Sequence, residues 1–171
     1  CNSVGNGAFV ELNTTGAWQA GSNPRFNSTL PTSSVFSVRG YANSSTNNNG
    51  AAYIAYCFHS VDGYSKVGSY TGNGSANGTF VHCGFRPAYV MVKRTDSANN
   101  WDISTGGDYF SNQIDARLRA NTSGAEETTG YIDFVSNGFK MRNVNGSQNQ
   151  SGGTFIFLAF AESPFKHTNA R

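Results

Sequence analysis

The sequence predicts an all-β fold, an antiparallel β-sandwich of jelly-roll type with little or no helix, on three observations. Only 13% of the 171 residues are charged, which is about half the usual share for a soluble protein. Asn, Ser, Thr and 20 glycines take their place, and these residues favour turns over helices. The apolar residues come in short runs separated by Gly and Asn, as in strands joined by turns.

The apolar pattern expected of strands recurs along the whole chain. It is found in Ala8–Leu12, Val35–Arg39, Tyr53–Val61, Tyr64–Tyr70, Thr79–Cys83, Tyr89–Arg94, Tyr131–Val135, Phe139–Arg142 and Thr154–Ala161. Asp62-Gly63 and Asn137-Gly138 each stand between two of these segments and predict two-residue hairpin turns. Ser111–Ala120 has Ile114 and Leu118 four residues apart, which leaves a helical turn or a loop open there.

Charge and motif content exclude several classes of function. The net charge is only +2 and the Lys and Arg residues are scattered, so we expect no nucleic-acid partner. No apolar run approaches the roughly 18 residues of a membrane-spanning helix, so no membrane insertion is expected. The glycine-rich stretch Gly72–Gly78 lacks the spacing of a nucleotide-binding loop, and the three histidines lack the paired spacing of zinc ligands. We therefore expect no cofactor and no metal site, and interpret Cys57 and Cys83 as small buried residues in strands.

Three segments of the first half recur in the second half in the same order. Asn13–Ala17 returns as Asn121–Ala125, Phe36–Arg39 as Phe139–Arg142, and Tyr53–Phe58 as Phe155–Phe160. The spacing of about 100 residues indicates an internal repeat. We interpret residues 1–67 as the C-terminal part of a first β repeat and residues 68–171 as a complete second β-sandwich repeat. The incomplete first repeat leaves sheet edges that a neighbouring copy, another subunit or a further segment would cover.

Three stretches of sequence carry a resemblance to a known family: Tyr53–Phe58 with Gly63–Gly74, Phe85–Asp96 and Gly153–Lys166. They resemble an uncharacterised repeat domain at the C-terminal end of bacteriophage tail-fibre-like proteins, common in marine and cyanobacterial phages. The resemblance implies a structural protein on the exterior surface of the virion, in a tail fibre, that takes part in host attachment. It implies contacts with other virion proteins and supplies no catalytic residue. A fibre component of this kind is expected to be a homo-oligomer, most simply a trimer.

Aromatic and polar residues gather between two predicted strands, in the pattern of a carbohydrate site. Such sites place an aromatic face against the sugar and add hydrogen bonds from Asp, Asn or Arg. The candidate ligand-binding residues are Trp101, Asp102, Tyr109 and Arg117, with Trp18 as a further candidate. The alternative is that both tryptophans pack in the core or between subunits.

Three functions remain open from the sequence. The first is attachment to a host surface glycan through loops. The second is cleavage of a capsular polysaccharide, which requires two carboxylates facing each other across a sugar. The third is a purely architectural virion module without a ligand. No residue is assigned a catalytic role, because the sequence brings no pair of carboxylates together.

Overall fold

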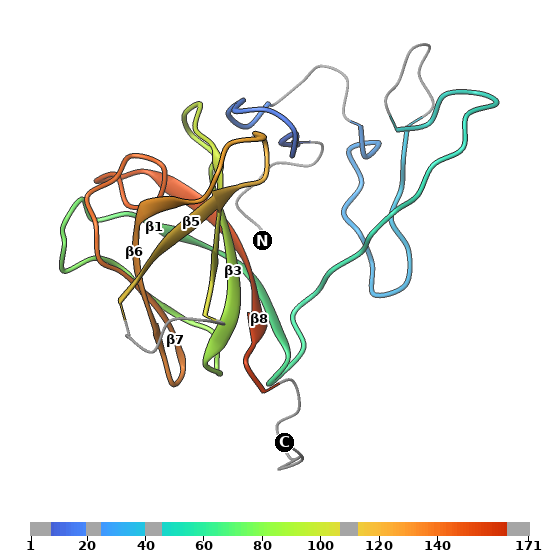
Figure 1. Ribbon diagram of the computed structural model, residues 1–171. Coiled ribbons are helices and arrows are strands. Elements are labelled where there is room, and N and C mark those ends of the chain that lie inside the picture. Colours follow the sequence, from blue (N-terminus) through green and yellow to red (C-terminus); the bar gives the residue numbers. More distant parts are fainter. Residues whose placement is uncertain (1–7, 20–24, 40–45, 107–112, 164–171) are drawn as a thin grey trace. The chain divides into compact units, whose positions relative to one another are not determined.

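The computed structural model describes residues 8–19, 25–39, 46–106 and 113–163 (Figure 1). The chain forms two compact units. The smaller unit comprises Cys1–Glu11 and Trp18–Cys57, and the larger comprises Leu12–Ala17 and Phe58–Arg171. All strands of the described residues lie in the larger unit. The predicted boundary between residues 67 and 68 falls inside the first of these strands.

The larger unit contains eight strands and, within the described residues, no helix. They are β1 (Ser65–Thr71), β2 (Phe80–His82), β3 (Pro87–Arg94), β4 (Trp101–Thr105), β5 (Gln113–Arg119), β6 (Glu127–Val135), β7 (Gly138–Met141) and β8 (Thr154–Ala161). Their order is β1-β8-β3-β4-β5-β6-β7-β2, and every neighbouring pair is antiparallel.

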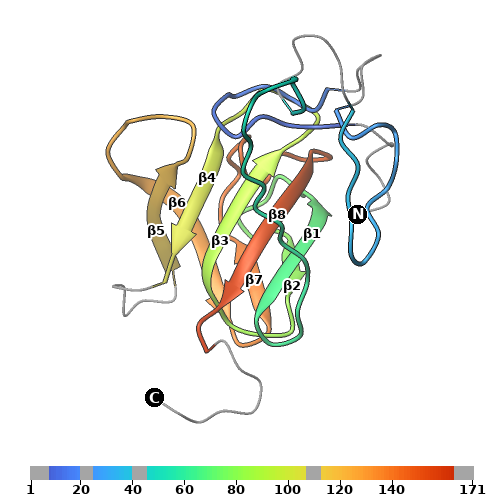
Figure 2. The same ribbon diagram turned by 90° about the vertical axis from the view of Figure 1, so that its right-hand side faces the viewer.

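The strands form two layers that share β5. The C-terminal end of β5 pairs with β4, the rest of the strand pairs with β6, and the register shifts between Ile114 and Ala116. Figure 2 shows β1, β8, β3 and β4 in front of β6, β7 and β2. The predicted antiparallel β-sandwich is therefore confirmed.

Aromatic side chains fill the space between the layers. Phe139 of β7 meets Phe157 of β8 edge-on, with the ring centroids 5.2 Å apart. Tyr70 of β1 stacks on Phe155 at 5.0 Å and turns its edge to Phe139 at 6.1 Å. The other large, fully enclosed apolar side chains are Val90, Val92, Ile132, Phe134 and Met141. Burial of these rings supplies the main driving force for joining the two layers.

The predicted hairpin at Asn137-Gly138 forms, with a different turn. Val135 pairs with Gly138, so the two-residue loop is Ser136-Asn137 and Gly138 already belongs to β7. A Cβ atom at position 138 would overlap the carbonyl oxygen of Val81 in the neighbouring β2. Glycine is required here because two strands approach closely, whereas the turn itself does not need it.

At Asp62-Gly63 the predicted turn forms, but the segment before it does not become a hairpin strand. Gly63 has a φ of 73°, and the backbone N–H groups of Tyr64 and Ser65 both donate to the Val61 carbonyl. The chain then enters β1, and on the other side of the turn only Val61 is bridged to β1. The Ser60 hydroxyl bonds both the N–H and the C=O of Val67, which closes part of the outer edge of β1.

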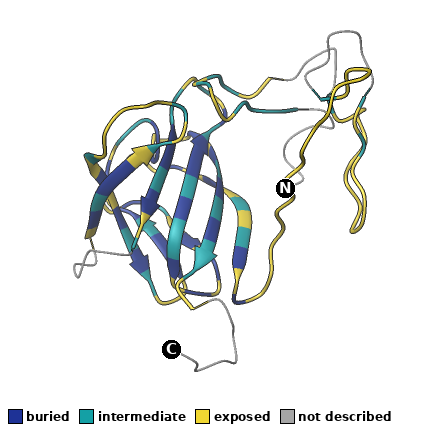
Figure 3. Ribbon diagram, turned by 45° about the vertical axis from the view of Figure 1, so that its right-hand side comes forward, coloured by how far each residue is buried: buried dark blue, intermediate teal, exposed yellow. Residues whose placement is uncertain are grey.

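Several predicted strands are absent, for one physical reason. Val35–Arg39 and Tyr53–Ser60 contain no strand, and Ala8–Leu12 retains a single bridge from Phe9 to Gln19. An isolated apolar run cannot form a strand unless another strand satisfies its backbone N–H and C=O groups. In Figure 3 the residues just before β1 are coloured as exposed, whereas the strands of the larger unit are mostly buried or intermediate.

The expectation of a helical turn or loop at Ser111–Ala120 is wrong, because residues 113–119 form β5. Strand β4 is also absent from the predicted set. Both strands turn charged side chains inward, which hides the alternation of apolar and polar residues on which the prediction depends. Within the described residues, no helix is long and apolar enough to cross a membrane.

Candidate functional site

Two of the predicted ligand-binding residues lie inside the sandwich. Asp102 is in β4 and Arg117 is in the neighbouring β5, and their side chains are 1% and 3% exposed. An Nη1 atom of Arg117 lies 3.5 Å from Oδ2 of Asp102. The sequence placed both residues in a long loop between strands, and the structure corrects this. The structure brings the two side chains together, and they do not face solvent.

A second carboxylate and a second arginine complete a cluster of four charges. Oε2 of Glu127, in β6, accepts hydrogen bonds from Arg117 at 2.7 Å and from Arg119 at 2.9 Å. Nε of Arg119 lies 3.9 Å from Oδ1 of Asp102, and the two residues are directly opposite each other in the register of β4 and β5. The positive and negative charges balance, and the cluster connects β4, β5 and β6 at the place where the two layers meet.

The loop between β7 and β8 also joins this cluster. The hydroxyl of Ser147 donates to Oδ2 of Asp102 and also lies within hydrogen-bond distance of Oδ1 of Asn145. Deeper in the loop the Asn149 side-chain amide is fully buried and donates to the carbonyl groups of Ser75 and Asn143. A buried amide with all its partners in place fixes a loop in one conformation. These residues explain why a loop with so few apolar side chains is ordered.

The pKa values of the two carboxylates in the cluster are shifted in opposite directions. Burial raises the pKa of Asp102, although the hydrogen bond from Ser147 and the charges of Arg117 and Arg119 act against this. The hydrogen bond from Arg117 lowers the pKa of Glu127. A carboxyl group of raised pKa beside one of lowered pKa is also the arrangement of a glycosidase acid and its partner.

The cluster differs from a glycosidase site in how far a substrate could reach its carboxylates. A catalytic acid must reach the glycosidic oxygen directly or through one water molecule, and the Asp102 side chain is enclosed by β4, β5 and the Ser147 loop. Glu127 is already held by two guanidinium groups. The geometry supports a role in holding strands together and gives no support to polysaccharide cleavage.

The remaining predicted site residues are placed separately. Trp101, at the start of β4, is 8% exposed, and its backbone N–H donates to the side chain of Asn121. Trp18 belongs to the smaller unit and is 36% exposed. Tyr109 lies outside the described residues. Trp101 thus takes the packing position that the sequence left open as an alternative to ligand contact.

Lys93 is a buried charged residue that the sequence did not single out. Its Nζ atom donates to the carbonyl groups of Asn99, at 2.6 Å, and Thr15, at 3.0 Å. Burial lowers its pKa. Lys93 therefore ties residues 12–17 and the loop after β3 to the sheet. In the sequence it looks like an ordinary strand-end lysine, so no pattern could reveal this role.

The two described cysteines differ from each other. Cys83 is buried, as predicted, and burial raises the pKa of its thiol to about 12. Cys57 is exposed and lies in a segment without strand structure, so its predicted burial in a strand is wrong. Neither forms a disulfide. Among the described residues, no group of three His, Cys, Asp or Glu side chains is arranged to hold a metal ion.

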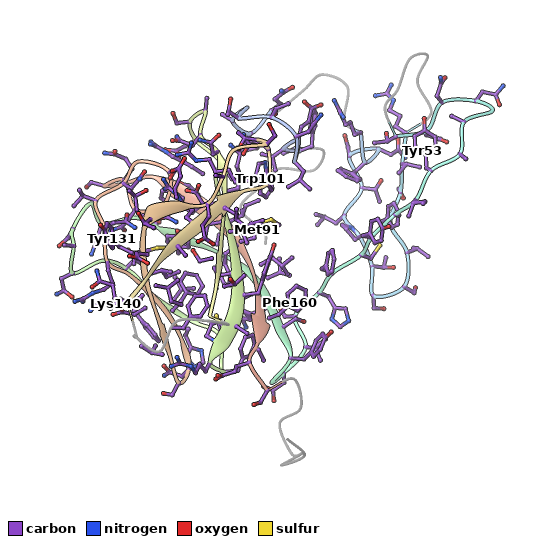
Figure 4. The ribbon with its side chains drawn as sticks, viewed as in Figure 1. Tyr53, Met91, Trp101, Tyr131, Lys140 and Phe160 are labelled. Atoms are coloured by element: carbon purple, nitrogen blue, oxygen red, sulfur yellow. The ribbon has the colours of Figure 1, made fainter. Side chains whose placement is uncertain are left out.

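The outer face of the β1-β8-β3-β4-β5 layer is the other distinctive feature of the larger unit. The strand registers place five apolar residues in one row across it, Val67, Leu158, Met91, Ile103 and Leu118. Figure 4 shows Met91 and Phe160 on this face, away from Tyr131 and Lys140 in the other layer. The outer face of an antiparallel sheet is ordinarily polar. On this face Val67 and Leu118 are exposed, and Leu158, Met91 and Ile103 between them are half-buried.

Comparison with known proteins places the chain in a family without assigning it a role. Residues 2–164 match the family model described as a domain of unknown function, DUF7483, and the chain belongs to this family. The match extends over both compact units. No curated protein and no solved structure matches the chain.

Proposed function

We propose that this chain is a non-enzymatic structural module on the exterior of a bacteriophage particle, in a tail fibre, where it assembles with further copies and takes part in attachment to a host surface glycan. One line of support is the resemblance of Phe85–Asp96 and Gly153–Lys166 to tail-fibre-like repeat domains. These stretches contain β3 and β8, which are inner strands of the β1-β8-β3-β4-β5 layer.

A single structural observation carries the proposal. The charged groups that could do chemistry, Asp102 and Arg117, are inside and hold strands together, whereas an apolar row from Val67 to Leu118 crosses the outer face of β1-β8-β3-β4-β5. Contiguous exposed apolar surface marks a site of protein association. The module therefore works through its surface and its neighbours, with no enclosed reaction site required.

Self-assembly accounts for the exposed apolar segment as well. Ile54 and Tyr56 are each 80% exposed, and they lie in the segment that repeats the sequence pattern of β8. A further copy of the chain supplies strands with the geometry that such a segment can join. A closed trimer would bury Ile54, Tyr56 and the apolar row from Val67 to Leu118 in three equivalent contacts. It would leave the end of the face beyond this row, and the loops of each copy, free to touch a receptor.

Light scattering on the purified chain, followed by localisation of the chain in whole particles with an antibody and electron microscopy, tests the proposal. The expected result is a defined oligomer, trimeric in the simplest case, and antibody label on fibres at the particle exterior. Label inside the capsid, or cleavage of host capsular polysaccharide by the purified chain, would contradict the proposal. An external position with all loops covered by other virion proteins would make the module architectural only.

A further inference from the structure

Four aromatic rings meet at one end of the outer sheet face, with Phe160 of β8 at their centre. The ring centroids of Phe58, Tyr64 and Tyr89 each lie 5.9 Å from that of Phe160. Phe58 and Tyr64 meet it edge-on, at interplanar angles of 71° and 72°. Because Phe58 is 58% exposed and Tyr64 is 43% exposed, the cluster presents ring surface to the outside instead of closing on itself.

The backbone fixes the position of these rings. Tyr89 is paired with Phe160 across β3 and β8. The N–H of Ala161, the next residue in β8, donates to the Tyr64 carbonyl at 2.9 Å. Strand pairing and this backbone hydrogen bond thus hold Tyr64, Tyr89 and Phe160 together, so these three rings are preorganised before any partner arrives.

A fixed ion pair joins the residues that flank β3 and β8, next to the Pro87–Ala161 pair. Nε of Arg86 lies 3.2 Å from Oε2 of Glu162, and the side chains are 45% and 60% exposed. The N–H of Glu162 donates to the Arg86 carbonyl, and Nη1 of Arg86 donates to the carbonyl of Phe134 at 2.6 Å. The guanidinium group is therefore anchored on two sides. Among the described residues it makes no further hydrogen bond, and its outer N–H groups remain as donors.

We propose that these six residues, Phe58, Tyr64, Tyr89, Phe160, Arg86 and Glu162, form a binding surface for a pyranose unit of an uncharged polysaccharide. We call them the aromatic platform. An aromatic face packs against the C–H groups of a sugar ring, and charged donors and acceptors at the rim form strong hydrogen bonds with its hydroxyl groups. This inference rests on the proposed attachment function and assigns it to a surface different from the one that the sequence suggested.

The charges of the platform favour an uncharged sugar over an acidic one. Arg86 and Glu162 contribute one positive and one negative charge, so the rim has no net charge with which to attract a polyanion. Binding through ring contact and hydrogen bonds is screened little by salt, unlike binding between net charges. An exposed platform of this size binds one sugar unit weakly. Repetition of the platform in an oligomer raises the overall affinity by roughly 10²–10⁴-fold.

Saturation-transfer NMR with methyl glucoside, methyl galactoside and methyl N-acetylglucosaminide, followed by titration with dextran, tests the platform. At least one of these probes is expected to receive saturation on its ring protons, with an affinity that changes less than twofold between 50 and 500 mM NaCl. Tyr64→Ala and Arg86→Lys are expected to weaken binding at least fivefold. Phe80→Ala removes a similarly exposed ring from β2 and is expected to leave binding unchanged.

Three results would overturn the inference. The first is no saturation transfer to any probe, and the second is an equal loss of binding in Phe80→Ala and Tyr64→Ala. The third is self-association of the chain that Tyr64→Ala abolishes, because this result would assign the platform to contact with a second copy of the chain. Far-UV circular dichroism of each variant shows whether the sandwich is intact. A failure in the NMR test leaves the external virion position untouched, and the antibody label tests that position separately.

Discussion

Two segments with the same apolar pattern have opposite fates in this molecule. Phe155–Phe160 is part of β8, bonded to β1 on one side and to β3 on the other, and Phe155 is fully buried. Tyr53–Phe58 has no strand partner in the described residues, and Ile54 and Tyr56 are almost fully exposed. The contrast teaches that the apolar pattern specifies what a segment can pair with, and that pairing itself decides whether a strand forms.

The largest expected contrast is in thiol reactivity. Cys57 lies in the exposed segment, whereas Cys83 is buried with its pKa raised to about 12. At pH 8, we expect iodoacetamide to modify Cys57 faster than Cys83 by roughly a thousandfold or more, because Cys83 reacts only when the sandwich opens. Mass spectrometry of tryptic peptides gives each rate separately. Comparable rates in the native state would break the comparison, and comparable rates in 6 M guanidinium are the control.

Removal of one ring from each segment gives the next largest effect. Phe155→Ala leaves a cavity beside Tyr70 and is expected to lower the free energy of unfolding by about 3–5 kcal/mol. Tyr56→Ala removes an exposed ring and is expected to change it by less than about 0.5 kcal/mol. Urea denaturation followed by circular dichroism measures both. A large loss in Tyr56→Ala would show that the exposed segment contributes to the core.

A pair of glycine variants sharpens the claim that close strand contact, more than local sequence, shapes the sandwich. Gly138→Ala forces a Cβ against the Val81 carbonyl, and we expect a loss of about 1–3 kcal/mol. Gly124→Ala places its Cβ in ordinary contact with Thr122 only and is expected to be neutral or slightly stabilising. Equal stability of the two variants, measured by thermal unfolding, would remove the steric explanation for Gly138.

The smallest expected effect concerns the anchoring of β8 at its first residue. Arg94 forms an ion pair with Asp96 at 2.8 Å, and the Thr154 N–H donates to the same carboxylate at 3.3 Å. These bonds lower the pKa of Asp96. Because the folded pKa is below the ordinary value, this stabilisation is present above about pH 4 and is lost as the pH falls through the folded pKa. Asp96→Asn is expected to cost less than about 1 kcal/mol at pH 7, since the pair is partly exposed.

Measurement of stability against pH checks the sign of this effect. The difference between the wild-type chain and Asp96→Asn should shrink as the pH is lowered from 5 to 2. A difference that grows on acidification would mean that the carboxyl group is destabilising when ionised, in conflict with the observed contacts.

The strands of the larger unit could be predicted wherever apolar residues dominate. Thr154–Ala161 forms a strand with the predicted bounds, and β3, β6 and β7 begin between one and four residues before the predicted start. Strands β4 and β5 could not be predicted, because Asp102 and Arg117 occupy inward positions that the pattern reserves for apolar residues. A buried ion pair between neighbouring strands depends on tertiary contacts that local sequence does not encode.

The candidate site was predicted less well, for a related reason. The sequence grouped Asp102 and Arg117 in one candidate surface site, and it gave no sign that their side chains form an ion pair inside the sandwich. The aromatic platform joins Tyr64, Tyr89 and Phe160, which only strand pairing brings together. In the sequence each is an ordinary aromatic residue of a strand or a turn, so no spacing rule could find them. The internal repeat stays a prediction.

Hydrogen exchange of backbone amides, at a concentration where light scattering finds single chains, tests the central claim most directly. The claim is that the same apolar pattern forms a strand only where partner strands are present. We expect the amides of Phe155–Phe160 to be protected up to the stability of the whole sandwich and those of Tyr53–Phe58 to exchange at close to unfolded rates. Equal protection of the two segments in the single chain would contradict the account.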